Sequence, residues 1–213
     1  MRNNYDPKFK EIPLKRTGQK RNFFESILIV CEGEKTEKNY FESFRIIERI
    51  QSVKIEVVGA GCNTVSVVKK AKELSEEAKQ YNSEFDQVWC VFDRDTFPAQ
   101  HFNSALSLAK NYNFKVAYSN EAFELWYLLH FNYYNTEIRR SSYCRMLSKL
   151  LCCKYTKDKI DMYDLLLNRQ TTAIHNAKTL INLYNPHNPE SDNPCTTVFK
   201  LVEELNKNKR QED

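Results

Sequence analysis

Short apolar runs alternate with amphipathic segments in the first half of the chain. We expect four runs to form strands: Ser26 to Cys31, Val53 to Val58, Val88 to Phe92 and Phe114 to Tyr118. The first and third are continuously apolar, which is typical of strands buried on both faces. Between the runs, apolar residues recur at the spacing of one helix face. Strands that alternate with such helices predict βα units and a mostly parallel sheet.

The pattern becomes helical after residue 120, with segments expected near 122–132, 137–152, 158–167, 171–185 and 195–207. Asn185 to Pro194 is rich in Pro and Asn and is expected to form a loop before the last helix. We therefore predict an α/β fold class, a mostly parallel sheet flanked by helices with a helical C-terminal portion. The expected parts are a basic arm over 1–24, an α/β core over 25–120 and a helical part over 121–213 that packs on the same domain.

Charge is concentrated near the start of the chain. The formal net charge is +4, and residues 1–22 hold seven Lys or Arg against Asp6 and Glu11, a balance of +5. A basic arm on a near-neutral body can tether nucleic acid through phosphate contacts and counterion release. A solvated tail explains the same composition equally well.

The seven cysteines contain no CxxC pair, so neither a disulfide framework nor a zinc knuckle is expected. No apolar run approaches the roughly 18–20 residues needed to cross a bilayer, and the start of the chain has no apolar signal core. We therefore expect a soluble protein with reduced thiols in the cytoplasm.

Acidic residues directly follow two of the predicted buried strands. Glu32 follows Cys31, and Asp93 and Asp95 follow Phe92. The carboxyl ends of parallel strands share one edge of a sheet, where ligands bind, so we expect the three carboxylates to converge. Clustered carboxylates suit a hard cation, Mg²⁺ or Mn²⁺, and such a metal supports phosphodiester hydrolysis. The alternative is structural, since carboxylates after strands often form turns or cap helices.

Further candidates lie near these acids. Lys35 is placed to neutralise a scissile phosphate, and Glu34 and Glu37 are candidates for a second ion, for capping or for a solvated face. Glu124 lies in an apolar run where an unpaired charge is expensive. It is therefore expected to bind the metal, or to form a structural salt bridge with one of the arginines at 139 and 140.

Polar residues also open the last predicted helix. A helix start of this kind can bind backbone phosphate, so Asn193, Thr196 and Thr197 are candidate nucleic-acid contacts. Ordinary helix capping is the simpler explanation. His130 lies in an apolar segment and is more readily explained as a core histidine than as a catalyst.

The motifs together resemble a known family. Ile29 to Gly33 resembles the first motif of Toprim domains, and Phe92 to Asp95 resembles their DxD motif. A narrower resemblance is to RloB-like proteins, on Cys31 to Phe41, Asp93 to Asp95, Ser119 to Phe131 and Asn193 to Val198. Two departures occur: Glu121-Ala122 stands where Pro-Cys is expected, and Lys38 stands where a proline is usual.

The resemblance implies a divalent-metal-dependent Toprim nuclease acting in defence against phage or foreign nucleic acid. Glu32 would be general base or acid and metal ligand, with Asp93 and Asp95 as the other metal ligands. Proteins that resemble this one are commonly encoded beside a large ATPase, so an ATPase partner is implied. The chain itself has no GxxxxGK[ST] loop.

Other functions stay open at the level of sequence. Nucleotidyl transfer of the primase kind would need a nucleotide pocket, and no motif for one is recognisable. Topoisomerase action is disfavoured because the chain is too short for a strand gate. A non-cleaving module that binds nucleic acid or a nucleotide is the main alternative. DNA or RNA as substrate, one metal ion or two, and a monomer or a homo-oligomer are all compatible with the sequence.

Overall fold

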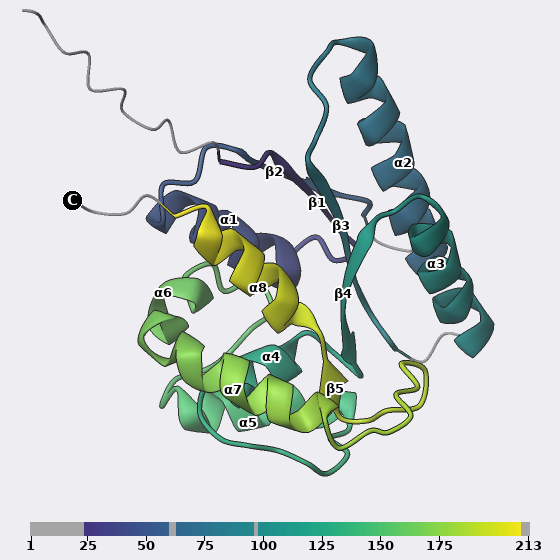
Figure 1. The fold of residues 1–213 in the computed structure, drawn as a ribbon. Helices are drawn as coiled ribbons and strands as arrows, with labels where there is room; N and C mark the ends of the chain where they lie inside the picture. Colours follow the sequence, from purple (N-terminus) through teal and green to yellow (C-terminus); the bar gives the residue numbers. More distant parts are fainter. Residues whose placement is uncertain (1–23, 60–62, 96–97, 210–213) are drawn as a thin grey trace, which may run out of the picture.

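The computed structural model describes residues 24–59, 63–95 and 98–209. Apart from its last residue, the predicted basic arm of residues 1–24 lies outside the described residues. Five strands form one sheet in the order β2-β1-β3-β4-β5 (Figure 1). Their bounds are β1 Ile27–Cys31, β2 Val53–Val57, β3 Gln87–Asp93, β4 Lys115–Asn120 and β5 Cys195–Thr196. The first four strands are parallel and β5 runs antiparallel to β4, which confirms the predicted α/β fold with a mostly parallel sheet.

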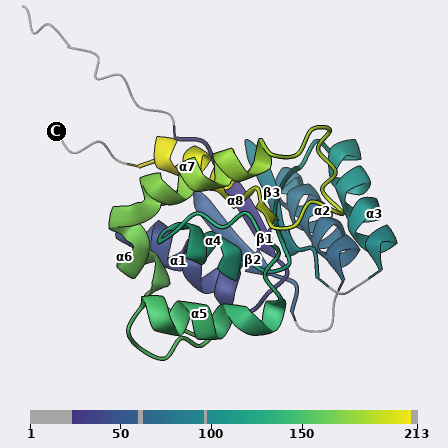
Figure 2. The same cartoon turned by 90° about the horizontal axis from the view of Figure 1, so that it is seen from below.

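Helices cover both faces of the sheet because side chains alternate along the central strand. Leu28 and Val30 of β1 point toward α2 (Thr64–Gln80) and α3 (Ala99–Asn111), whereas Ile27, Ile29 and Cys31 point to the other face. That other face packs against α1 (Thr36–Ile47). All five β1 side chains are therefore buried, as the continuous apolar run predicts. Figure 2 shows α2 and α3 on one side of the sheet and α1 on the other.

The C-terminal portion is helical, as predicted, and shares the apolar cluster that lies between the sheet and α1. It consists of α4 Glu124–Leu129, α5 Tyr143–Leu150, α6 Met162–Leu166, α7 Gln170–Ile181 and α8 Val198–Lys207. Trp126 of α4 is fully buried at its centre. Within the described ranges, no helix is both long and apolar enough to span a bilayer.

The predicted helix over 195–207 is wrong in its first residues, because Cys195 and Thr196 form β5. They pair with Asn120 and Ser119 of β4. The Thr197 hydroxyl then accepts a hydrogen bond from the Tyr118 amide at 2.9 Å. The edge of β4 supplies hydrogen-bond partners for these residues, so they pair with the sheet and the helix starts only at Val198.

Candidate active site

Two acidic residues meet where the sheet topology reverses direction. From β1 the chain crosses to β2 on one side and then, through α2, to β3 on the other side of β1. The crevice at the carboxyl ends of β1 and β3 is therefore the expected ligand position in such a sheet. Glu32 follows β1 directly and Asp93 ends β3, and the Asp93 amide donates to the Glu32 carboxylate at 3.3 Å.

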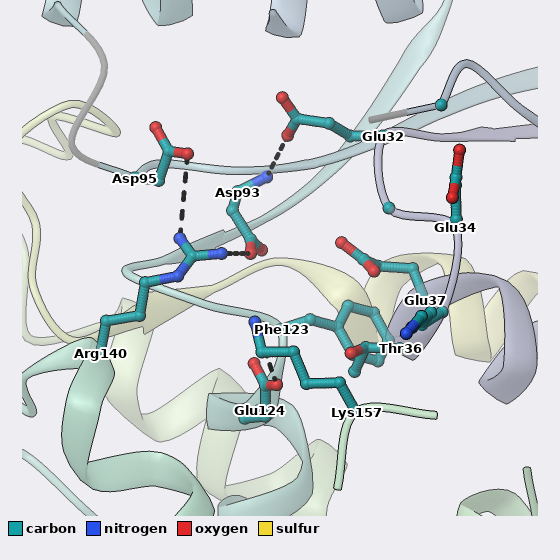
Figure 3. Close-up of a pocket in the computed structure, with 13 residues that line it drawn as sticks. Glu32, Glu34, Thr36, Glu37, Asp93, Asp95, Phe123, Glu124, Arg140 and Lys157 are labelled. Carbon is teal, nitrogen blue, oxygen red and sulfur yellow. Dashed lines mark hydrogen bonds and ion pairs between the residues drawn. The ribbon is translucent and has the colours of Figure 1, made fainter. Parts of the chain in front are cut away.

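A cavity of about 350 Å³ opens at this position. Six of its lining residues carry carboxyl groups and three are basic, which gives a formal charge of −3 if all are ionised. The carboxyl groups belong to Glu32, Glu34, Glu37, Asp93, Asp95 and Glu124, and the basic groups to Lys35, Arg140 and Lys157. The structure thus brings together all five predicted residues of the acidic site, including Lys35 and Glu124 (Figure 3).

The central carboxylates are buried, and burial makes their charged forms expensive. Burial raises the pKa of Asp93 well above its usual range; the nearby Glu37 raises it further and Arg140 opposes the rise. Burial also raises the pKa of Glu32 to about 7, against the hydrogen bond from the Asp93 amide. Such groups gain most from a cation that compensates the lost hydration.

Arg140 is the principal cation of the site. From the sequence it was expected only as a possible salt-bridge partner of Glu124. Its guanidinium lies 3.3 Å from Asp93 Oδ2 and 3.9 Å from Asp95 Oδ2. It belongs to a 3₁₀ turn, Arg140–Ser142, just before α5. The paired arginines near the start of the predicted 137–152 helix were the available signal, but sequence spacing does not reveal that this turn reaches the β3 end.

Glu37 is more central than the sequence indicated. Its carboxylate is buried in the first turn of α1 and points toward Asp93 across the cavity (Figure 3). Burial raises the pKa of Glu37, and the Glu124 carboxylate adds to that rise. A Cβ atom at Gly33 would overlap the Glu37 carboxylate, so only glycine leaves room for it there.

Glu124 pairs with groups other than the arginines considered for it. Its carboxylate lies 3.7 Å from Lys157 Nζ and accepts a hydrogen bond from the Tyr155 hydroxyl at 3.3 Å. The salt bridge to Arg139 or Arg140 is therefore replaced by one to Lys157, because Arg140 turns toward the β3 acids. Lys157 comes from the segment between α5 and α6, where no sequence pattern marked it.

Of the four predicted phosphate contacts, Lys35 lines this cavity, whereas Asn193, Thr196 and Thr197 do not. Thr196 is fully buried, and its hydroxyl bonds with Ser119 and with the Tyr118 carbonyl. The Thr197 hydroxyl is likewise bonded to the sheet. Both hydroxyls are therefore occupied by the β4 edge, which corrects their assignment as phosphate ligands. Asn193 lines a neighbouring depression that shares Asp95 with the cavity.

The donor groups of the cavity fit a hard divalent cation. Asp93 Oδ1 is buried and accepts no hydrogen bond from any described residue. That unsatisfied oxygen, among carboxylates with raised pKa values, matches the oxygen ligands that Mg²⁺ and Mn²⁺ prefer. In the part of the chain that the structure describes, no three His, Cys, Asp or Glu side chains are already gathered at metal-binding distances.

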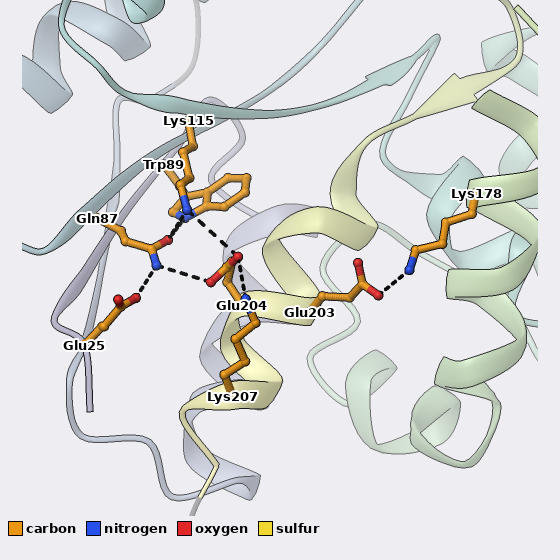
Figure 4. Close-up of polar contacts among 8 residues, drawn as sticks. All are labelled: Glu25, Gln87, Trp89, Lys115, Lys178, Glu203, Glu204 and Lys207. Atoms are coloured by element: carbon orange, nitrogen blue, oxygen red, sulfur yellow. Dashed lines mark hydrogen bonds and ion pairs between the residues drawn. The ribbon is translucent and has the colours of Figure 1, made fainter. Parts of the chain in front are cut away.

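A second charged cluster lies at the opposite end of β3 and has a structural role. The side-chain oxygen of Gln87, Oε1, accepts hydrogen bonds from Trp89 Nε1 and Lys115 Nζ, both at 2.9 Å. Its side-chain nitrogen, Nε2, donates to the Glu204 carboxylate at 3.3 Å (Figure 4). Lys207 pairs with Glu204 at 2.9 Å. This network attaches α8 to the sheet and leaves the cluster's charges paired with one another.

His130 is a core histidine, and a pH-dependent stability follows from it. Its Nδ1 bonds the Trp126 carbonyl at 2.8 Å, and burial lowers its pKa to about 4. Between about pH 6.5 and 4 the unfolded chain takes up a proton at His130 that the folded protein excludes, so the contribution of His130 to the free energy of unfolding falls by about 3 kcal/mol as the pH drops through that window. Buried Glu32 titrates in the opposite direction, so the wild type is compared with His130→Asn, which keeps a donor but does not titrate. In urea unfolding from pH 7.5 to 4.5, the stability of the wild type should fall relative to that of His130→Asn. Equal slopes would contradict this origin.

Comparison with known proteins agrees with the motifs. The family model described as RloB-like protein matches residues 27–205, from the first strand to the last helix. In a comparison with curated proteins, no relative matches the chain. The matched region contains every residue that lines the acidic cavity. On this match, which covers most of its length, the chain belongs to the RloB-like protein family.

Proposed function

We propose that this protein is a divalent-metal-dependent nuclease that hydrolyses phosphodiester bonds of DNA or RNA. The observation that supports this most directly is the acidic cavity at the β1 and β3 ends, where Asp93 keeps a buried, unsatisfied carboxylate oxygen. Mg²⁺ or Mn²⁺ held there would supply Lewis-acid stabilisation of the charge that develops on the phosphoryl and leaving oxygens.

The side chains of the cavity would bind the metal, accept a proton and neutralise the substrate phosphate. Asp93 and Asp95 hold the cation, and Glu124 is a further candidate ligand. Glu32 accepts the proton of the attacking water, a role suited to a carboxylate whose pKa is about 7. Lys35 lies at the cavity wall before α1 and neutralises the phosphate of the substrate.

The biological setting is also a proposal. The resemblance to Toprim nucleases suggests a role in defence against phage or foreign nucleic acid, in the cytoplasm and together with an ATPase encoded nearby. The net positive charge of the chain favours a polyanionic partner.

The test is incubation of the purified protein with end-labelled plasmid, single-stranded DNA and tRNA, in Mg²⁺, Mn²⁺ or EDTA. We expect cleavage of at least one substrate that needs the metal and that Asp93→Asn lowers by about 10³-fold. Asp164→Asn, an exposed carboxylate on α6, is the matched control and should cleave as the wild type does. Metal-dependent binding without cleavage, with or without the neighbouring ATPase, would favour a binding module instead.

A further inference from the structure

The position of Arg140 raises the question of what a cation does in the middle of a proposed metal site. Its guanidinium lies between Asp93 and Asp95, the two residues proposed as metal ligands. It therefore neutralises the same two carboxylates that a divalent cation would need, although on Asp93 it contacts Oδ2 and not the unsatisfied Oδ1. A fixed pair of this kind would compete with the metal, so the strength of the pair matters.

The distances indicate a weak pair. Charge-assisted contacts between arginine and carboxylate are usually about 2.7–2.9 Å long when they are strong and bidentate. Here the two contacts are 3.3 Å and 3.9 Å, and each goes to a different carboxylate. The Arg140 side chain is also 38% exposed, compared with 9% for that of Asp93. Water therefore reaches the guanidinium, so it can leave the carboxylates and stay hydrated.

The backbone of Arg140 is held independently of its side chain. Its amide donates to the Glu121 carboxylate at 2.8 Å, directly after β4. The guanidinium also donates to the Glu121 carbonyl at 3.2 Å, a single contact that breaks when the side chain rotates. When the side chain rotates away from Asp93, the backbone of Arg140 therefore stays fixed at the cavity wall. The guanidinium remains within reach of a ligand in the cavity.

We infer that Arg140 is an exchangeable cation that neutralises Asp93 and Asp95 until a metal binds and then contacts a phosphate of the substrate. Glu121 is the positioning residue that keeps Arg140 at the cavity. The inference rests on the proposed function for its metal and its substrate class. It adds a phosphate-binding residue and an order of events, in which metal binding frees the positive charge for the nucleic acid.

The first test measures Mn²⁺ affinity by isothermal titration calorimetry on the full chain, without nucleic acid. Arg140→Gln is expected to bind Mn²⁺ about 3- to 10-fold more tightly than the wild type, because the competing charge is gone. Arg140→Lys should be intermediate, since one ammonium cannot bridge both carboxylates. Arg139→Gln, the exposed neighbouring arginine, is the matched control and should bind Mn²⁺ as the wild type does.

The second test measures the affinity for a fluorescein-labelled single-stranded DNA oligonucleotide by anisotropy. Arg140→Gln should weaken binding about 10-fold in Ca²⁺ and leave it unchanged in EDTA, because the wild-type guanidinium is then occupied by the carboxylates. Equal weakening in both conditions would overturn the exchange. Unchanged or weaker Mn²⁺ affinity in Arg140→Gln, with a wild type that binds Mn²⁺, would overturn the inference alone. No Mn²⁺ binding by any variant would overturn the inference and the proposed function together.

Discussion

Glu32→Gln is expected to cleave nucleic acid about 10³-fold more slowly than the wild type and yet to be the more stable protein at about pH 8. The loss of rate follows because an amide cannot accept the proton of the attacking water. The fold should survive, since the glutamine carbonyl can still accept the hydrogen bond from the Asp93 amide. Rate and stability thus change in opposite directions.

The gain in stability follows from the pKa of Glu32, which burial raises from 4.5 to about 7. Between these values the folded protein binds more protons than the unfolded chain, so stability falls as the pH rises through that window. Above it the wild type carries the full penalty of a buried charge, whereas Glu32→Gln carries none. The expected difference at pH 8 without metal is about 2 kcal/mol, or about 4–8 °C in Tm.

Calorimetric unfolding at pH 5 and pH 8, with cleavage rates measured in parallel, checks both effects. At pH 5, near the lower end of that window, the difference in Tm should be only about a quarter of that at pH 8. Glu77→Gln, an exposed glutamate on α2, is the control and should change neither quantity. A Glu32→Gln protein that cleaves at the wild-type rate would remove Glu32 from the reaction.

Gly33→Ala is expected to lower cleavage about 10²-fold while it changes stability little. The added methyl group would overlap the Glu37 carboxylate, which must then leave its place opposite Asp93. A displacement of about 1 Å in a catalytic site is enough for an effect of this size. The stability effect is small because only the end of a flexible side chain has to move.

A compensating change separates this explanation from a backbone effect. Aspartate at position 37 is one methylene shorter and leaves space for the new methyl group. The double variant Gly33→Ala with Glu37→Asp should therefore cleave faster than Gly33→Ala alone. If the second substitution restores nothing, displacement of the Glu37 carboxylate is not the cause of the loss.

The parts of the site that sequence predicts best are those fixed by strand ends. Glu32 and Asp93 follow apolar runs, and the geometry of parallel strands brings such positions to one edge without any knowledge of the loops. Arg140 and Lys157 come from the C-terminal portion, and their positions depend on how its helices pack. That packing is a tertiary property, so no local sequence pattern predicts it.

The same distinction explains the error at Thr196 and Thr197. Polar residues before an amphipathic helix normally indicate a free helix start, and α8 does follow them. The unsatisfied edge of β4 was not visible in the sequence, and a strand of only two residues, Cys195–Thr196, has no periodicity to detect. The Thr197 hydroxyl bonds with the Tyr118 amide and the Thr196 hydroxyl with Ser119, so both are directed to the sheet.

The antiparallel β5 strand also determines how the cavity can admit a ligand. It returns the chain to β4 after the 121–194 segment, whose helices α4 to α7 contribute to the same apolar core as the sheet and α1. Cys195 and Thr196, which pair with β4, are fully buried at the end of that segment. The 121–194 segment is therefore no independent lid. On the exchange proposed for Arg140, a ligand would reach the acids through the movement of that one side chain.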